Sequence, residues 1–275
     1  MLLKLNNTEG IKEYMHTDQV LHNIGRILGA LGHQLVNTKA DDSHSNFTCK
    51  DTEKWLEGRS FLVNESELRF VFSLEHWEFI LLDASNNSLA RVPVAKMPLP
   101  EIIYQLEMIL TAKTLNINGF ASRIYFKHQH VISSEGIMGQ PTEESLETWG
   151  ALRALANEKL KEFLNEIQEN SEHPIWPTNF DTGVATRMGE NFHYSGLSPA
   201  DEVSNEPYFY TALYAVGGGG IPTDGLGQLP YGFWKNDHWK GAVLKLSDID
   251  FTGGVDHQVL TFLVSSYNSY ITKAR

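Results

Sequence analysis

The sequence is poor in cysteine, in basic residues and in long apolar runs. Cys49 is its only cysteine, which excludes an intramolecular disulfide and a cysteine-rich zinc site. Lysine and arginine number 22 against 34 aspartate and glutamate residues, so the formal net charge is −12 at pH 7. A field of this sign opposes binding to the phosphates of nucleic acid and to an anionic membrane. We therefore expect neither as a partner.

Signals of membrane insertion and of secretion are also missing. No stretch approaches the roughly 20 consecutive apolar residues of a transmembrane helix. The first ten residues, MLLKLNNTEG, become polar at Asn6 and Asn7, too early for the apolar region of a signal peptide. We therefore expect a cytoplasmic protein. Its 275 residues, 41% of them hydrophobic, are enough to build a substantial core.

The spacing of apolar residues in the first half predicts two helices and a β-hairpin. Between about Tyr14 and Val36 they recur every three or four positions, as in an amphipathic helix. Residues 67–73 and 77–82 alternate as two antiparallel strands joined by a tight turn. A second helix follows Pro98 and Pro100. The first helix contains three glycines, for which close approach of another backbone is the expected compensation: Gly25, Gly29 and Gly32. The second has a predicted buried stripe of Ile102, Leu106, Ile109 and Leu110.

The second half opens with a strand candidate, RIYFKHQHVI from Arg123, followed by a long amphipathic helix over residues 143–169 that Thr142 caps. DTGVATR and YFYTALYAV read as further strands, and a last helix runs from Asp256 to about Thr272. Helices mixed with antiparallel-style strands, without regular alternation of the two, predict an α+β fold. We expect two halves, 1–120 and 121–275, packed as one globular unit.

Several local patterns together resemble the bacterial family catalogued as domain of unknown function 5996. The stretches that carry the resemblance are LHNIGRILGAL, FVFSLEH, FDTGVATRMGE, YGFW and DHQVLTFLVSSYNSY. They contain His22, Gly29, Phe70, Phe72, His76, Asp181, Thr186, Arg187, Gly189, Asp256, Phe262, Leu263, Ser266 and Tyr267. This sequence departs from the family where SHSNF, with His44, replaces a strand rich in histidine and tryptophan, and where Ala30 follows Gly29. The resemblance implies no activity.

Histidines are the first candidates for chemistry. His128 and His130 lie two residues apart in the strand candidate, a spacing found in some metal sites, but without a third ligand a solvated strand face is the preferred interpretation. His22, His76 and His44 are selected by the resemblance, and each could instead be a hydrogen-bonded structural histidine. Asp41 and Asp42 read as a solvated loop. We therefore expect no metal site, and the sequence specifies no cofactor.

Arg187 follows alternating residues of a predicted strand. One hypothesis is a structural ion pair with Asp181 or Asp256, because an arginine on a sheet usually needs a partner. The other is a guanidinium group that receives the carboxylate or phosphate of a ligand. Both could hold together.

The segment LPYGFWKNDHWKG, residues 229–241, follows a glycine-rich stretch at 215–227. That stretch lacks the helix start and the Gly-Lys-Ser/Thr of a phosphate loop, so we expect a mobile loop that could act as a lid. Phe233 and Trp234 carry large apolar areas on an irregular backbone. They predict an aromatic plug that closes the loop, or a pocket wall formed by Trp234 with His238 and Trp239 toward its mouth.

These residues define the predicted site, a cleft for a small polar or anionic ligand. Its candidate ligand-binding residues are His22, His76, Arg187, Trp234, Asp181 and His238. An enzyme would use the two histidines as acid and base, which requires that the side chains converge. The alternative is a non-catalytic interaction or structural module, with an exposed aromatic patch and separated histidines. The sequence leaves the reaction and the oligomeric state open.

Overall fold

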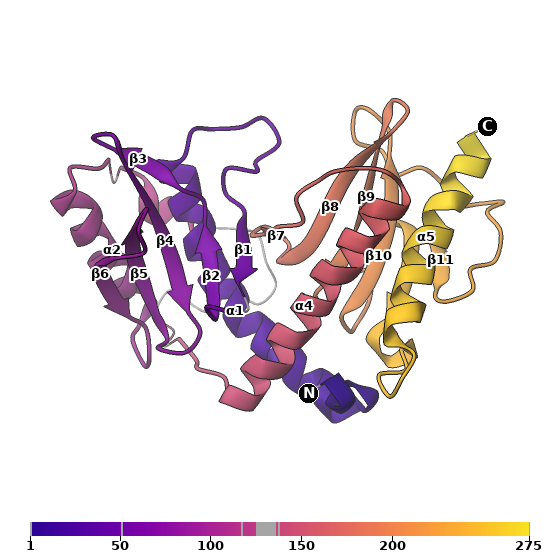
Figure 1. Cartoon of the computed structure of the whole chain (residues 1–275), viewed down its shortest axis with the longest axis horizontal. Coiled ribbons are helices and arrows are strands. Elements are labelled where there is room, and N and C mark those ends of the chain that lie inside the picture. Colours follow the sequence, from indigo (N-terminus) through magenta and orange to yellow (C-terminus); the bar gives the residue numbers. More distant parts are fainter. Residues whose placement is uncertain (1, 51, 117, 125–135, 137, 275) are drawn as a thin grey trace. The chain divides into compact units, whose positions relative to one another are not determined.

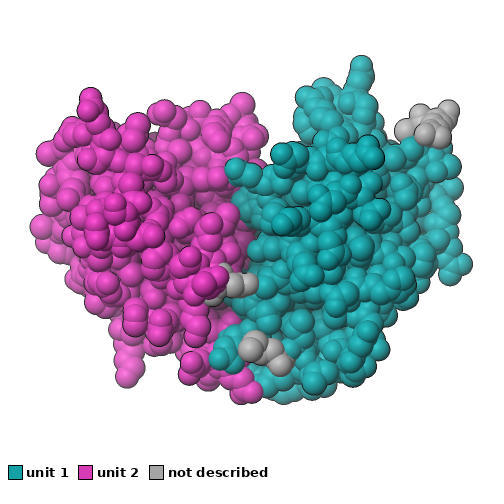
Figure 2. Space-filling model, viewed as in Figure 1, with its two compact units in different colours: residues 1–15, 147–174, 181–275 teal, residues 16–146, 175–180 magenta. Residues whose placement is uncertain are grey.

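The computed structural model describes residues 2–50, 52–116, 118–124, 136 and 138–274. It is an α+β protein of antiparallel strands and helices, as predicted (Figure 1). The chain forms two compact units, which Figure 2 distinguishes by colour. Unit 1 comprises residues 1–15, 147–174 and 181–275, and unit 2 comprises 16–146 and 175–180. Unit 2 thus holds most of the first predicted half, but residues 1–15 lie in unit 1 and 121–146 in unit 2.

Unit 2 is built on an antiparallel sheet in the order β7-β1-β2-β4-β5-β6, with β3 paired to β4. The strands are β1 (Phe47–Lys50), β2 (Trp55–Gly58), β3 (Phe61–Val63), β4 (Ser66–Ser73), β5 (Glu78–Asp83), β6 (Ser88–Pro93) and β7 (Ile175–Trp176). Its helices are most of α1 (Thr8–Leu35), α2 (Leu99–Ala112) and α3 (Phe120–Arg123).

The predicted hairpin is confirmed as β4 and β5, and both of its faces are buried. On one face Val71, Ile80 and Leu82 form a cluster against Trp55. On the other, the ring of Phe72 meets that of Trp77 edge-to-face at 5.0 Å. Burial on both faces explains why apolar residues occupy the two alternating positions of these strands.

Helix α1 begins at Thr8, ahead of the predicted start, and its glycines allow close packing. A Cβ atom on Gly32 would lie 2.6 Å from the backbone oxygen of His44, so another backbone does approach here, as predicted. At Gly25 the neighbours are instead two rings, with a Cβ position 2.7 Å from Phe47 and 2.8 Å from Phe180.

Two predictions about this part of the chain need correction. In α2, Ile102, Leu106 and Leu110 are buried, but Ile109 is only half-buried, because the helix turns it toward the edge of the predicted stripe. Arg123 ends the short helix α3 rather than beginning a strand. The remainder of that strand candidate, with His128 and His130, lies outside the described residues.

Unit 1 is built on an antiparallel sheet in the order β11-β12-β10-β9-β8. Its strands are β8 (Asp181–Met188), β9 (Asn191–Ser198), β10 (Tyr208–Tyr214), β11 (Phe233–Asn236) and β12 (Lys240–Lys245). Its helical elements are η1 (Leu2–Asn6), the start of α1, most of α4 (Glu143–Glu166), η2 (Leu246–Asp248) and α5 (Val255–Ala274). Thr142 caps α4 as predicted, because its Oγ1 accepts a 3.2 Å hydrogen bond from the Ser145 N–H.

Helices α4 and α5 cover one face of this sheet (Figure 1). His193 of β9 marks that face, since its ring packs against Phe163 of α4 and against Tyr267 of α5, with centroids 5.9 and 4.9 Å apart. Thr186 is paired directly with His193 and so shares the helix-covered face. Arg187, the next residue along β8, therefore lies on the opposite face.

Gly25→Ala tests the packing of α1 in unit 2. The added methyl group meets two buried rings, and overpacking of this kind costs about 1–3 kcal/mol, more than the helix propensity of up to about 1 kcal/mol that alanine restores. We expect a lower free energy of unfolding in urea titrations. Gly219→Ala, where a Cβ has nothing within 4 Å, is the control and should stay near wild type. An equally stable Gly25→Ala variant would contradict the packing described.

His193 provides a test of the core of unit 1 through pH. It is fully buried, neither ring nitrogen has a hydrogen-bond partner among the described residues, and burial lowers its pKa from 6.5 to about 3. Below pH 6.5 the His193 side chain binds a proton in the unfolded chain but stays neutral in the folded chain. Stability should therefore fall between pH 6.5 and about 3, by up to about 1.4 kcal/mol per pH unit.

The measurement is the urea unfolding free energy of the wild type and of His193→Phe across this pH range. Phenylalanine keeps a ring of similar size but cannot bind a proton, so its pH dependence should be flatter. Parallel curves would show that the imidazole is already protonated or solvated in the folded state.

Candidate functional site

The two candidate histidines of unit 2 lie on different elements. His22, on α1, is hydrogen-bonded through Nε2 to the carbonyl oxygen of Pro177 at 3.0 Å, and its ring stacks on Phe180 at 4.9 Å. His76 lies on the turn between β4 and β5, with its side chain 60% exposed and its Nε2 3.9 Å from Glu75. His22 is thus held by the segment 177–180, whereas His76 faces solvent. A joint acid–base role for them stays a prediction.

Arg187 and Asp181 lie on the same strand but near its two ends. Six residues of β-strand span about 20 Å, so the expected ion pair between them cannot form. Asp181 instead accepts a 2.5 Å hydrogen bond from the hydroxyl of Tyr210. Burial raises the pKa of Asp181 above its ordinary value, and the Tyr210 hydrogen bond opposes this shift. The second expected partner, Asp256, pairs with Lys159 at 3.0 Å.

Trp234 does not share a surface with Arg187. It lies on β11 opposite Ala242, and Ala242 is opposite Thr211, which pairs with Ser195 and, through it, Val184. Val184 is three residues from Arg187 on β8, an odd number, so the pleat turns the two side chains to opposite faces. The predicted pocket containing both residues is therefore wrong in this respect.

The predicted aromatic plug agrees with the position of Trp234 but not with that of Phe233. The Trp234 ring packs edge-to-face on Tyr270 of α5 at 5.3 Å, and its Nε1 donates a 2.8 Å hydrogen bond to the carbonyl oxygen of Gly227. The tryptophan thus ties the glycine-rich loop to the body of unit 1. Phe233 points the other way and is 42% exposed, because residues 233–236 form a strand rather than the irregular backbone we expected.

His238 occupies the exposed turn between β11 and β12. Its Nδ1 lies 3.1 Å from Asp237, and its Nε2 lies 3.1 Å from the carbonyl oxygen of Glu202. Trp239 packs over Gly241, where a Cβ would lie 2.3 Å from the indole. The turn is thus held by Asp237 beside it and by Glu202, which is distant in sequence. Trp239 lies on the face of Gly241, which pairs with Lys235 and is therefore opposite the face of Trp234.

The surroundings of Arg187 form a second surface on unit 1. The guanidinium carbon lies 4.4 Å from the centroid of Phe192, directly across on β9. Tyr194 lies two residues further along β9, faces the same side, and meets Tyr214 edge-to-face at 5.6 Å. Ala185, opposite Tyr194, adds only a methyl group. We call Ala185, Arg187, Phe192, Tyr194 and Tyr214 the Arg187 surface.

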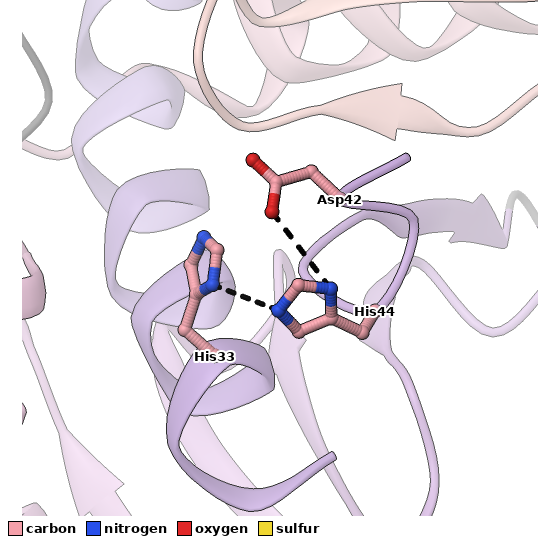
Figure 3. A group of neighbouring side chains, drawn as sticks. All are labelled: His33, Asp42 and His44. Carbon is pink, nitrogen blue, oxygen red and sulfur yellow. Dashed lines mark hydrogen bonds and ion pairs between the residues drawn. The ribbon is translucent and has the colours of Figure 1, made fainter. Parts of the chain in front are cut away.

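A further cluster in unit 2 brings together His33, Asp42 and His44 (Figure 3). His33 lies in the last turn of α1, and the other two lie on the loop that follows it. Each residue offers one nitrogen or oxygen atom, and these three atoms lie within 4.8 Å of one another. The two imidazoles are closest, with 2.9 Å between Nε2 of His44 and Nδ1 of His33.

Hydrogen bonds position the rings of this cluster. The backbone N–H of Lys39 donates to Nδ1 of His44 at 3.3 Å, which leaves the proton of a neutral His44 on Nε2, directed at Nδ1 of His33. Burial lowers the pKa of His33 below its ordinary value, with the charge of Asp42 acting in the other direction. The cluster therefore offers a neutral imidazole at pH 7.

The sequence prediction selected only part of this cluster. The resemblance selects His44, the sequence places Asp42 in a solvated loop, and no motif marks His33. The available signal was His33 itself, a histidine in the last turn of the predicted helix, eleven positions before His44. This histidine indicates a site only when the loop is known to return to the helix at Gly32, which brings His44 beside it.

Comparisons with known proteins add no family. No family model matches the chain, and no curated protein or solved structure matches it significantly. The resemblance to domain of unknown function 5996 thus stays a prediction. Among the described residues, no helix is both long and apolar enough to cross a membrane.

Trp234→Phe tests the tie between the glycine-rich loop and unit 1. Phenylalanine keeps the contact with Tyr270 but loses the hydrogen bond to Gly227, which contributes about 1 kcal/mol. We expect faster amide hydrogen exchange in residues 215–229 with a small fall in overall stability. Phe233→Ser, an exposed change on the opposite face, is the control. Equal exchange in wild type and Trp234→Phe would show that other contacts hold the loop.

Proposed function

We propose that the protein binds a small anionic ligand with a flat ring at the Arg187 surface of unit 1. The observation that carries this proposal is the state of the guanidinium group. It is exposed, lies over the ring of Phe192, and forms no ion pair with any described carboxylate. A guanidinium group that lies over a ring and has no ion-pair partner keeps its N–H donors available to a carboxylate or phosphate.

Aromatic side chains beside Arg187 support a ring as the other part of the ligand. Phe192 and Tyr194 lie 6.5 Å apart between centroids, and Tyr214 braces Tyr194 from β10. Because Ala185 is small and exposed, it leaves the ring of Tyr194 accessible from the side of Arg187. Aromatic pairs contribute about 0.5–1.5 kcal/mol beyond the area that they bury. An aromatic anion would use both groups at once.

The overall charge of −12 acts against this ligand and shapes the expected behaviour. A single guanidinium must overcome a repulsive field that salt screens over about 10 Å at 0.1 M. Added salt thus weakens both the local attraction and the long-range repulsion, and the affinity should change less with salt than at a basic site.

Neither catalysis nor a cytoplasmic location is required by this proposal. His22 and His76 lie in unit 2, and their service as acid and base is a separate hypothesis. A cytoplasmic location likewise stays a prediction from the sequence.

A protein-interaction role is the second candidate. It is favoured by Tyr104 and Met108, which lie one helical turn apart on the outer side of α2 and are both more than half exposed. Adjacent apolar side chains of this size are typical of contact sites.

Binding is tested by thermal shift and calorimetry with aromatic carboxylates, nucleotides, and inorganic phosphate as the ringless control. A ligand that binds only the folded chain raises its melting temperature. Arg187→Gln should weaken binding by roughly tenfold to a hundredfold, the range for a charge-assisted hydrogen bond. Arg187→Lys keeps the charge but not the planar fork, so its affinity should lie between those of the wild type and Arg187→Gln.

Lys161→Gln removes the same charge from an exposed position of unit 1 and should leave the affinity unchanged. If Arg187→Gln and Lys161→Gln weaken binding equally, the loss of affinity comes from net charge and not from a contact with Arg187. Failure of every aromatic anion to bind would remove the proposal. Self-association or partner capture that Met108→Ser abolishes would favour the interaction role.

A further inference from the structure

We propose that His33, Asp42 and His44 form a binding site for a divalent transition metal ion of the zinc class. The inference is independent of the Arg187 surface, because all three residues lie in unit 2. It rests on the identity of the donor atoms, their separation, and the way in which the loop holds them against α1.

The donor set selects the class of ion. Two imidazole nitrogens and one carboxylate oxygen suit zinc, cobalt and related ions, whereas magnesium and calcium prefer oxygen ligands alone. Three protein ligands leave a coordination position for water or for an anionic oxygen of a ligand. Zinc sites with this open position are those that act as Lewis acids.

The distances fit a site that closes on its ion. With Zn–N bonds of about 2.0–2.1 Å in a tetrahedron, two ligand nitrogens lie about 3.3 Å apart. The His33 and His44 nitrogens are 2.9 Å apart across a hydrogen bond, so the rings must separate slightly. The Oδ1 of Asp42 lies 3.9 Å from Nδ1 of His44, on the other side of the ring from His33, so this carboxylate must also move. Its side chain is 66% exposed and can turn toward the ion. Binding at Nε2 also requires the His44 proton to move to Nδ1, which gives up the hydrogen bond that Nδ1 accepts from the Lys39 N–H.

The loop is held in a fixed conformation before any ion binds. Its backbone lies on α1 at Gly32, where even a Cβ atom would come within 2.8 Å of Ser45. The Asp42 N–H donates to Lys39 at 3.2 Å, and the Asp42 carbonyl accepts hydrogen bonds from both the N–H and the hydroxyl of Ser45. Asp42 itself has a left-handed backbone, with φ of 62°, which aspartate and asparagine tolerate better than most residues.

The burial of the His44 ring is a second sign that the site is preorganised. His44 is only 2% exposed, and its ring meets that of His33 edge-to-face, with centroids 4.6 Å apart. A buried ligand ring cannot swing into solvent, so little conformational freedom is lost when the ion binds. The exposed side of the cluster, at Asp42, is the side from which an ion would enter.

The test uses the untagged full-length protein, freed of metal with a chelator, and titrated with Zn²⁺ by calorimetry and with Co²⁺ by visible absorption. We expect one ion per chain and the absorption bands of a four- or five-coordinate cobalt site. Mg²⁺ should not compete. His33→Gln keeps a good helix former, and Asp42→Asn keeps the tolerance for a left-handed backbone, so both should fold.

Each of these variants should weaken Zn²⁺ binding by at least about tenfold, since loss of even an outer-shell partner costs that much. His76→Gln is the matched control, because His76 also lies near one carboxylate, Glu75, at 3.9 Å, but forms no such cluster with a second histidine among the described residues. It should bind as wild type does. Urea unfolding curves confirm that the variants are folded.

Loss of binding in His33→Gln and Asp42→Asn with retention in His76→Gln supports the site. No uptake of Zn²⁺ or Co²⁺ by the wild type would show a hydrogen-bonded histidine pair only, and would overturn the proposal. Uptake at wild-type affinity by the folded His33→Gln variant would do the same. Neither result bears on the binding of aromatic anions, which is measured with Arg187 variants.

Discussion

Antiparallel hydrogen bonding in unit 1 determines which side chains can act together. Once Arg187 is registered against Phe192 and Thr186 against His193, every other position of β8, β9 and β10 is assigned to a face. Arginine and tyrosine then share the open face, whereas His193 and Trp234 share the face that α4 and α5 cover. The separation of these groups follows from a pleat of period two, and no rotation of a side chain can reverse it.

Unit 2 obtains its candidate site in another way, from a short loop that returns to its own helix. His33 and His44 are eleven residues apart, and Gly32 lets the loop backbone lie where any side chain would stand. Closing so short a loop costs little entropy compared with joining distant segments. The cluster therefore depends on local structure, and the environment of Arg187 depends on strand pairing.

Most of the elements could be predicted from the sequence, because their signals are periodic and local. The hairpin β4–β5, the capped helix α4 and the helix α5 each extend over many residues, and the packing in the structure follows the same apolar pattern as the sequence. Ile109 and Phe233 were misjudged because their exposure depends on neighbours that periodicity does not identify. The expected ion pair of Arg187 failed for a similar reason, since a nearby carboxylate in sequence is remote along an extended strand. His33 carried no distinctive motif, and only the approach at Gly32 gives it a partner.

The chain crosses between its two units at residues 15–16, 146–147, 174–175 and 180–181. Strand β7 pairs with β1 through Ile175 and Phe47. It is therefore synthesised more than a hundred residues after the strand that it pairs with. During synthesis on the ribosome, unit 2 must wait with an open sheet edge until residue 180 has emerged. Unit 1 combines residues 1–15 with residues 147–174 and 181–275. Neither unit is a contiguous stretch of the sequence, so each is completed only after residues of the other unit have been synthesised.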